Sequence, residues 1–577
     1  MLESLVTLIP KSHESQASLL TYGLFLRLFG LVYLVQFASA LPQVLPILGR
    51  EGIEPARLLL KAARRDLRGL SPYLKFPTLC WLDDGDRALR GLCVVGMLAA
   101  LGIVTGIAGP GTPLLFLVAW LCWLSIVTVG STCFGLPWDK LLVEAGFLAL
   151  FMPGLQPLPE LAVLEAPMPV AVLAFRWLVF RVMFGMGLAK FRTLDRETRD
   201  GTFLQRYYDR QPMPTVLAFH VQALPLGFHK FCLAAFFLTE MVLPFLAFGP
   251  WEARAVTSLA FMGLQVVIWL TGNYGIFNLL VLVLSVPLLA GDFAYGSVLF
   301  PQGPGEAVAS AVLFAHFLLS LPYAFLLDSW SGSSWLYSKR SLSAHTLFRH
   351  LGPLIGLYRW LAPFHVLNAY GIFVPGVFRN RRMSTVLQGS NDQQTWFDYE
   401  PRFLPCATTA RPRRFAPHHP RFDHYIYYER GLSSYRTFPW LWQTNPYYLH
   451  PYCFKEKVVQ KLLRGEKAPL FFFRNNPFPG QPPKWIRYSS WVYEFTTPEE
   501  RARTGHWWRR ELVGQSEPIA MEEQLDELAG LQDDYRPFLS DNVCYLRTGA
   551  VAYTDPKSGE KIPIQLHPIQ LTGTTSS

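Results

Sequence analysis

Charged residues are scarce in this chain: they make up 16% of the sequence, whereas hydrophobic residues make up 51%. A soluble protein normally carries more charge than this. The scarcity is uneven, because long apolar runs repeat as far as Leu327, while Arg, Pro, Tyr and Trp become dense from Asp328 onward. The sequence therefore predicts a membrane-embedded first part and a water-soluble second part.

Several motifs of metal, cofactor and nucleotide sites are also missing. The eight cysteines include no CxxC pair and no zinc-ligand spacing, which argues against a zinc site and a disulfide framework. Only Cys406, Cys453 and Cys544, all in the second part, are candidates for pairing with one another. No glycine-rich phosphate loop, HExxH motif or GxSxG motif occurs. The net charge of +10 comes without a nucleic-acid-binding motif, so we predict no cofactor, no metal and no nucleic-acid partner.

Nine hydrophobic stretches are candidates for transmembrane helices, because a helix needs about 20 mainly apolar residues to cross the hydrocarbon core. They lie near residues 18–41, 89–108, 113–130, 137–153, 171–190, 228–249, 255–271, 277–291 and 309–327. The fourth and eighth are short, so we expect them to be tilted, re-entrant or sheltered inside the bundle. The first lacks the features of a cleaved signal peptide, and we expect it to be retained.

The loops carry their basic residues unequally. With nine spans, the loops at 42–88 and 191–227 share one side of the membrane with the second part, and nearly all loop Arg and Lys fall there. The positive-inside rule would make that side cytoplasmic. Residues 51–70 fit two structures equally well: an amphipathic helix lying at the membrane interface, or a solvated loop helix.

Ionisable side chains are rare inside membrane spans, because removing them from water is costly, and they usually face a partner or a cavity. The fifth stretch carries Arg176, Arg181 and Lys190, and Glu144 and Glu240 are natural counter-charges for the arginines. The predicted polar network of the membrane part consists of Asp139, Glu144, Arg176, Arg181, Lys190, Glu240, Asn273 and Asn278. Packing ion pairs are the favoured interpretation, and catalysis or transport is the alternative.

Small and amide residues accompany this network. Gly185 and Gly187 lie on the fifth stretch, where residues without bulky side chains let helices approach closely. Asn273 and Asn278 lie in TGNYGIFNLL, which is typical of a tight helical hairpin between two spans. We expect these amides to bond backbone groups that the turn leaves free.

The second part shows the alternation of β-strands. Residues 383–400 alternate on both sides of the turn formers 389–393, as a β-hairpin requires, and residues 485–496 alternate again. We predict a mainly β soluble domain over residues 364–550. It follows a helical membrane domain at 1–330 and a linker at 331–363, and a flexible tail follows at 551–577.

Aromatic residues are dense in this predicted β domain. The candidate binding residues are Trp396, Trp485, Trp491, Trp507, Trp508, Arg509 and Arg510. Tryptophan and arginine dominate binding hot spots, although packing in a small β core is the alternative for each tryptophan. The HWWRR cluster at 506–510 is predicted to be exposed, which makes it the leading candidate.

Two histidines stand out in the motif RFAPHHPRFD. His418 and His419, with Asp423, contain atoms that could bind a metal. The sequence offers no third ligand at a suitable spacing. A loop anchored by prolines is therefore the favoured interpretation.

Long strings in both parts closely resemble the lipase maturation factor family. They include PWDKLLVEAGFLA (137–149), FRWLVFRVMFGMGLAKF (175–191), LTGNYGIFNLL (270–280), VLQGSNDQQTWFDYE (386–400) and RFAPHHPRFD (414–423). The resemblance implies an endoplasmic-reticulum membrane protein that helps secreted lipases fold and assemble into active homodimers, acting as a chaperone. The candidate tryptophans and arginines would then bind the client lipases.

The resemblance also implies a cytosolic N-terminus and a luminal soluble domain, opposite to the positive-inside assignment. We follow the resemblance, because that rule weakens for long folded segments. The sequence contains no Asn-x-Ser/Thr sequon and no retention signal of the KDEL type. A bacterial inner-membrane protein with a periplasmic soluble domain fits equally well.

The membrane part is also similar to the vitamin K-dependent gamma-carboxylase (HTTM) group. There, the lysine of a comparable Gly-x-x-Lys stretch acts as a base, and GLAK places Lys190 at that position. The histidine that follows a Trp-Asn pair in the carboxylases is missing from PWDKLL. A membrane enzyme using Lys190 as base is therefore the alternative function, and a transporter is weaker because no inverted repeat is visible.

Overall fold

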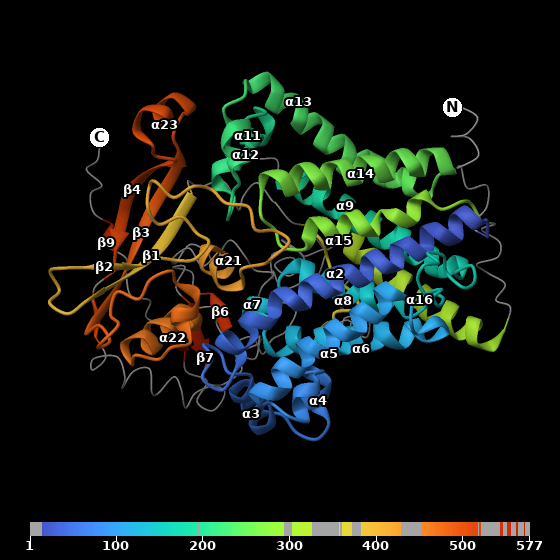
Figure 1. Ribbon diagram of the computed structural model, residues 1–577, viewed down its shortest axis with the longest axis horizontal. Coiled ribbons are helices and arrows are strands. Elements are labelled where there is room, and N and C mark those ends of the chain that lie inside the picture. Colours follow the sequence, from blue (N-terminus) through green and yellow to red (C-terminus); the bar gives the residue numbers. More distant parts are fainter. Residues whose placement is uncertain are drawn as a thin grey trace.

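The computed structural model describes residues 14–193, 196–293, 303–325, 357, 360–371, 382–428, 452–516 and 518–520, with short strands at 543–545, 551–554, 561–563 and 570–571. A bundle of long helices forms one end of the molecule and a β-sheet domain forms the other (Figure 1). The first long helix, α2 (Gln16–Leu48), begins at the end of the bundle remote from the sheet. This arrangement confirms a polytopic helical membrane protein with a β domain.

Seven helical segments in the described part of the chain are long and apolar enough to cross a membrane. They are Gln16–Leu48 (α2), Asp86–Thr105 (α5), Gly109–Val129 (containing α6, Thr112–Val129), Pro169–Phe191 (within α9, Pro169–Thr193), Leu226–Phe248 (α13, Leu226–Phe237, with η3, Leu238–Val242, and η4, Leu243–Phe248), Trp251–Thr271 (α14) and Pro304–Ala324 (within α16, Pro304–Phe325). Each overlaps one of the nine predicted stretches.

The fourth and eighth predicted stretches form shorter helices. Helix α8 (Pro137–Ala149) has 13 residues, and α15 (Phe277–Leu284) continues only through η5 (Val286–Leu289). Thirteen residues extend about 20 Å, too little for a hydrocarbon core of about 30 Å. Both helices are mostly buried, so other helices shelter them as expected.

The two short helices nevertheless connect the two ends of the bundle. Asp139, at the start of α8, contacts the sheet domain, whereas Leu155 beyond α8 donates to the carbonyl of Gly109 at the opposite end (3.3 Å). Beyond α15, the amide of Gly291 donates to Ser18 Oγ at the start of α2 (2.8 Å). Within the described residues, the helices therefore pass through the bundle nine times, and the sheet domain lies opposite the start of α2.

The long loops at the sheet-domain end contain further helices. They are α3 (Ala56–Asp66), α4 (Ser71–Lys75), η1 (Leu79–Trp81), α7 (Ser131–Phe134), α10 (Arg196–Arg199), α11 (Phe203–Arg210) and α12 (Val216–Gln222). Helix α3 lies within the predicted amphipathic stretch, and Leu59, Leu60 and Ala63 on its apolar side are buried. Since α3 packs against α6, this apolar side contacts protein.

The sheet domain is built around antiparallel strands in the order β2-β1-β3-β4-β9, with β5 also paired to β3. The strands are β1 (Arg382–Ser390), β2 (Phe397–Tyr399), β3 (Trp485–Phe495), β4 (Trp508–Gln515), β5 (Ile519–Ala520) and β9 (Gln570–Leu571). A second sheet contains β6 (Val543–Tyr545), β7 (Val551–Thr554) and β8 (Lys561–Pro563). Strands β1 and β2 form the predicted hairpin, with Leu387 opposite Tyr399.

The two faces of the main sheet differ. On one face, Tyr399 packs against Phe473 and Phe478, with ring centroids 5.3 and 6.1 Å apart. On the opposite face, Gln388 and Arg487 are register partners whose side chains bond each other.

The other described elements of this part are helical. They are α21 (Arg421–Tyr428), α22 (Tyr452–Leu463) and α23 (Pro498–Thr504), with η7 (Ala362–Phe364) and η10 (Pro469–Phe472).

Cys406, one of the three candidates for disulfide pairing, is not paired. Cys406 is a buried free cysteine whose thiol donates to Asp398 Oδ2 (3.6 Å). Burial raises the pKa of this thiol, because the thiolate would lose its water. The side chains of Cys453 and Cys544, the other two candidates, lie outside the described residues.

Candidate functional site

Two segments that follow the last long helix insert into the helix bundle. Residues 362–371, the inner segment, reach the centre of the bundle, and residues 411–424, the docking loop, lie against its sheet-domain end. Each segment meets a buried carboxylate of α8. The predicted network residues Glu144 and Asp139 therefore contact parts of the chain that are remote in sequence.

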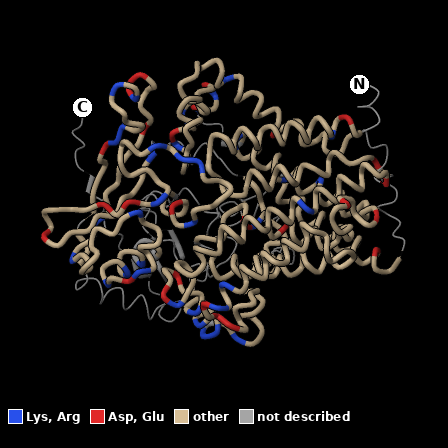
Figure 2. Tube along the Cα trace, viewed as in Figure 1, with Lys and Arg blue, Asp and Glu red and all other residues tan. Residues whose placement is uncertain are grey.

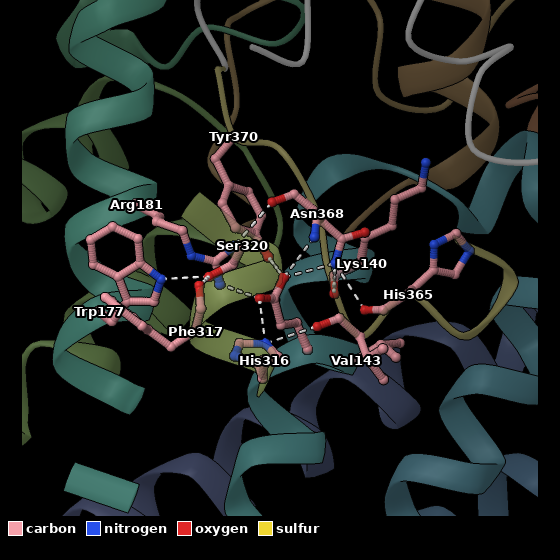
Figure 3. A network of polar contacts seen from close by, with 12 residues as sticks. Lys140, Val143, Trp177, Arg181, His316, Phe317, Ser320, His365, Asn368 and Tyr370 are labelled. Atoms are coloured by element: carbon pink, nitrogen blue, oxygen red, sulfur yellow. Dashed lines mark hydrogen bonds and ion pairs between the residues drawn. The ribbon is translucent and has the colours of Figure 1, made fainter. Parts of the chain in front are cut away.

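Glu144 is the centre of the inner site, and the side chains that bind it are themselves buried. Figure 3 labels four of its neighbours, Arg181, His316, Asn368 and Tyr370. Its Oε1 is paired with the guanidinium of Arg181 and lies 3.1 Å from Nε2 of His316. Its Oε2 accepts from the backbone amide (3.0 Å) and side-chain amide (2.9 Å) of Asn368 and from the hydroxyl of Tyr370 (2.6 Å). Five donor groups thus surround one carboxylate, which offsets the cost of burying it.

The sequence of α9 makes room for the inner segment. A Cβ atom on Gly185 would lie 2.3 Å from the carbonyl oxygen of Tyr370, closer than any side chain permits. Arg181 precedes Gly185 by four residues and faces the same side, where its Nη1 donates to the carbonyl of Asn368 (3.1 Å). The glycine lets the backbone approach, and the arginine binds it.

The docking loop carries an arginine to the second buried carboxylate. Arg421 binds Asp139 with both nitrogens, Nη1 to Oδ2 at 2.5 Å and Nη2 to Oδ1 at 2.9 Å. Both side chains are fully buried, and Gln36 of α2 donates to the same carboxylate (2.7 Å). Gln43 of α2 accepts from the amide of Arg421 (2.9 Å) and donates to the carbonyl of His419 (2.9 Å). The loop is therefore bonded to two helices of the bundle.

The loop histidines form part of this contact. His418 Nδ1 lies 3.0 Å from Ser39 Oγ, and His419 Nε2 lies 3.1 Å from His424 Nδ1. Burial, with the nearby charge of Arg421, lowers the pKa of His418 to about 4 and that of His424 to about 3. Within the described part of the chain, no group of three His, Cys, Asp or Glu side chains is placed to hold a metal ion.

Asp423 takes a different part in the loop. Its Oδ1 accepts from the backbone amides of Phe403 (2.9 Å) and Leu404 (3.1 Å). Burial raises the pKa of this carboxyl group to about 6. Asp423 thus joins the docking loop to the backbone at Phe403 and Leu404 of the sheet domain.

The two predicted asparagines bond different partners. The side-chain amide of Asn273 donates to the carbonyls of Arg413 (2.8 Å) and Met213 (3.0 Å), and its oxygen accepts from the amides of Phe415 and Ala416, both at 3.0 Å. Asn273 therefore bonds the backbone of the docking loop. Asn278 instead donates to Gln265 Oε1 (2.9 Å) inside the bundle.

A third charge pair lies between α9 and η3. Lys190 Nζ lies 2.8 Å from Glu240 Oε2 and donates to the carbonyl of Met186 (3.2 Å). Glu240 therefore pairs with lysine, whereas the sequence suggested an arginine; Arg176 packs over the ring of Phe293, 4.9 Å from its centroid. Glu240 belongs to a π-helical turn, a feature that often marks functional sites.

Comparisons with known proteins agree across both parts of the chain. The model of the lipase maturation factor transmembrane domain matches residues 20–296, and that of the lipase maturation factor C-terminal domain matches residues 366–518. The chain belongs to the lipase maturation factor family. Both buried centres join the two matched regions, since Glu144 and Asp139 lie in the first and Asn368 and Arg421 in the second.

Individual relatives match over most of their length. Lipase maturation factor 1 of Bos taurus is 29% identical over 530 residues, covering 86% of this chain and 88% of the relative. Lipase maturation factor 1 of Homo sapiens is 28% identical over 522 residues, covering 87% and 88%. Lipase maturation factor 2 of Gallus gallus is 28% identical over 591 residues, covering 85% and 80%. No solved structure matches the chain.

The predicted exposure of the HWWRR cluster is wrong for its tryptophans. Trp507 is 6% exposed and Trp508 is 2% exposed, whereas Arg509 and Arg510 are exposed. Trp507 packs edge-on against Phe219 of α12, with centroids 5.1 Å apart. Since α12 belongs to the membrane part, Trp507 joins the two parts of this family member.

Trp508 is buried for a related reason. It pairs with Phe495 across β3 and β4, with ring centroids 4.5 Å apart, and its Nε1 donates to the carbonyl of Ala410 (2.8 Å). The guanidinium of Arg382 lies over its ring at 5.1 Å and binds the carbonyls of Gln211 and Pro212 beyond α11. Trp508 therefore also lies near the junction of the two parts.

The other three candidate tryptophans are partly exposed. Arg487 lies over the ring of Trp396 at 4.1 Å, and Arg510 lies over the ring of Trp491 at 4.3 Å. Trp485, Arg487 and Trp491 occupy alternate positions of β3, so their side chains share one side of the sheet. We call Trp396, Trp485, Arg487, Trp491 and Arg510 the aromatic–arginine face.

Proposed function

We propose that this chain is a membrane-anchored maturation factor that assists the folding and assembly of secreted lipases into active homodimers. Its sheet domain would face the lumen of the endoplasmic reticulum, or the periplasm in a bacterium. Family membership and the lipase maturation factors that match most of the chain support the proposal. In this reading the protein acts by binding its client.

The aromatic–arginine face is the observation that carries the proposal. Tryptophan and arginine are enriched at binding hot spots, because one residue supplies both a large apolar area and polar groups. The rings of Trp396 and Trp491 are partly exposed and each is covered by a guanidinium. Such a surface suits a client that exposes both apolar and acidic side chains before it has folded.

The buried charge centres support this function indirectly. Glu144 and Asp139 bind the inner segment and the docking loop through groups of the protein itself. We propose that these centres, with Asn273, hold the sheet domain in a fixed position on the bundle, while Arg176, Lys190, Glu240 and Asn278 pack the bundle itself. A chaperone attached in this way presents its binding face at a constant height above the membrane.

Removing one ring of the face tests the proposal. In cells that lack their own maturation factor, Trp491→Ala should lower the yield of active secreted lipase several-fold and weaken lipase capture from a gentle detergent extract. Phe397→Ala is the matched control, since Phe397 is also an exposed aromatic residue (49%) but points to the other side of the sheet. Equal loss in both variants, or none in Trp491→Ala, would contradict the proposal.

A membrane enzyme that uses Lys190 as base is a second candidate. The π-helical turn at Glu240 favours it, together with Glu240 Oε1, which is buried without a hydrogen-bond partner among the described residues. Arginine cannot lose its proton as a base must. A folded Lys190→Arg variant that matures lipase, beside a truncation after residue 330 that does not, would support the chaperone. The reverse pattern would favour the enzyme.

A further inference from the structure

Residues 67–82, the lateral segment, form a compact structure beside the bundle. The segment contains α4 and η1, and the indole of Trp81 donates to the carbonyl of Phe76 (2.7 Å). Its second half is tied to α6, because the amide of Leu79 donates to Ser125 Oγ (2.9 Å). Phe76 and Cys80 of the segment are buried as well. The segment is therefore held in one position.

Despite this anchoring, the segment exposes large apolar side chains. Leu82 is 87% exposed and Leu70 is 74% exposed, and Tyr73 and Leu74 are exposed as well. Contiguous exposed apolar surface on a well-packed element marks an interaction site. Within the described part of the chain, no helix or strand covers these exposed side chains.

The position of the segment indicates what covers it. Helices α3 and α4 lie to the side of α5 and α6, near the end of the bundle that carries the sheet domain (Figure 1). Helix α5, which starts four residues after the segment, exposes Val94, Val95 and Leu98 on its outer surface. Such residues on a membrane span face lipid. The lateral segment therefore precedes a lipid-facing helix directly in the chain.

The depth of the segment follows from the geometry of α5. The helix spans residues 86–105, so its first residue lies about 15 Å from its midpoint at 1.5 Å per residue. This distance equals half of a hydrocarbon core of about 30 Å. The lateral segment therefore lies at the level where the hydrocarbon meets the headgroups, where tyrosine and tryptophan are enriched.

Basic side chains accompany the apolar ones. Arg64, Arg65 and Arg68 are exposed, and the guanidinium of Arg64 lies 5.0 Å from the ring centroid of Trp81. Figure 2 shows Lys and Arg gathered around α3, together with Asp and Glu, whereas the long helices carry few charges. Basic residues above an apolar surface are typical of a segment that binds anionic lipid headgroups.

We propose that residues 67–82 lie in the bilayer interface, in the leaflet nearest the sheet domain. Leu70, Leu74 and Leu82 enter the upper acyl region, and Arg64, Arg65 and Arg68 bind the phosphates of anionic lipids. The segment then fixes the height of the sheet domain through α3, because Glu54, just before α3, pairs with Lys457 of α22 (3.1 Å). This inference does not depend on the identity of the client.

Lipid quenching of a fluorescent amino acid tests the proposal. The fluorescent amino acid replaces either Leu74 or Leu82 in the full chain. Each labelled protein is placed in phosphatidylcholine nanodiscs whose brominated acyl chains quench the fluorescence. Leu98, in the middle of α5, is the lipid-facing control, and Phe397 is the exposed control in the sheet domain. We expect quenching at Leu74 and Leu82 to be several-fold above Phe397 and below Leu98. Quenching equal to that at Phe397 would overturn the proposal, whether water or a second protein covers the segment.

A second measurement tests the headgroup contact. Adding phosphatidylglycerol to the nanodiscs should increase the quenching at Leu74, and the triple variant Arg64→Gln, Arg65→Gln, Arg68→Gln should lose this increase. The matched variant Arg196→Gln, an exposed arginine of α10, should keep it. An increase that survives in the triple variant would overturn the assigned role of these arginines.

Discussion

Single charges inside the bundle determine how the inner segment is held. Glu144 receives bonds from three different parts of the chain, namely α9, α16 and the inner segment. The sequence could predict a Glu144–arginine pair, because both residues stand out within apolar stretches. It could not predict Asn368 or Tyr370, which look like ordinary residues more than 220 positions away. Only the fold brings their donors to the carboxylate.

The first prediction concerns the removal of the charge on Glu144. Glu144→Gln leaves Arg181 buried without its counter-charge, so the free energy of unfolding should fall by about 3–5 kcal/mol. Thermal unfolding in detergent measures this loss. Glu165→Gln, on an exposed loop, is the control and should change stability by less than about 0.5 kcal/mol. A double variant with Arg181→Met should recover part of the loss, and no recovery would argue against a dominant charge effect.

The second prediction concerns backbone approach. Gly185→Ala places a methyl group against the carbonyl of Tyr370, so the inner segment must shift and stability should fall by about 1–3 kcal/mol. Gly263→Ala on α14 is a matched control, because a Cβ there meets no atom within 4 Å. That variant should gain slightly from its higher helix propensity. Equal melting temperatures for the two variants would contradict the close approach.

At the scale of elements, the sequence predicted what alternation and turn chemistry determine locally. The β1–β2 hairpin follows from period-two alternation around Ser390 and Asp392, whose oxygens accept from the turn amides. The interpretation of RFAPHHPRFD as a loop anchored by prolines stays a prediction, and the insertion of the docking loop between helices was not visible in the sequence. Arg421 pairs with a residue 282 positions away, and no local pattern encodes such a contact.

The third prediction concerns acid and the docking loop. His418 and His424 have pKa values of about 4 and about 3 when folded, against about 6.5 when unfolded. Their stabilising effect is complete above pH 6.5 and is lost as the pH falls, because the unfolded chain takes up protons first. Asp423, with its pKa raised to about 6, acts in the opposite direction as the pH falls from 6 to 4. Burial also holds the pKa of His419 well below 6.5, so three histidines oppose one carboxyl group and we expect acid to loosen the loop.

A variant isolates the contribution of one histidine. His418→Gln keeps a polar partner for Ser39 but cannot be protonated. Between pH 6.5 and pH 4, the variant should therefore lose about 2 kcal/mol less free energy of unfolding than the unchanged protein. This figure allows for the partial exposure of His418. Melting temperatures of both proteins over this pH range give the difference. Parallel pH profiles would show that His418 does not carry the effect. His506→Gln, in the sheet domain, is the control.

At the scale of the whole molecule, hydrophobic stretches predicted the membrane part because bilayer thickness and backbone bonding leave little choice there. Seven stretches are full-length helices, and two are short helices inside the bundle. The domain limits proposed at residues 330, 363 and 550 stay predictions. The exposure of side chains was harder to predict from the sequence. Trp507 and Trp508 lie at the junction between the two parts, and the alternation of a strand does not show whether a residue faces solvent or another part of the protein.

The final prediction concerns the compartment of the sheet domain. The loops at the sheet-domain end hold nearly all the loop Arg and Lys of the membrane part and favour the cytosol by the positive-inside rule, whereas the proposed function requires the lumen. Gly480 is exposed with open space around it, so Gly480→Asn with Pro482→Ser introduces a glycosylation sequon without steric conflict. In microsomes this variant should gain a glycan that an endoglycosidase removes. The sequon formed by Leu164→Asn with Ala166→Ser, at the opposite end of the bundle, should remain unmodified. Modification of the second site alone would place the sheet domain in the cytosol and exclude direct contact with secreted lipases.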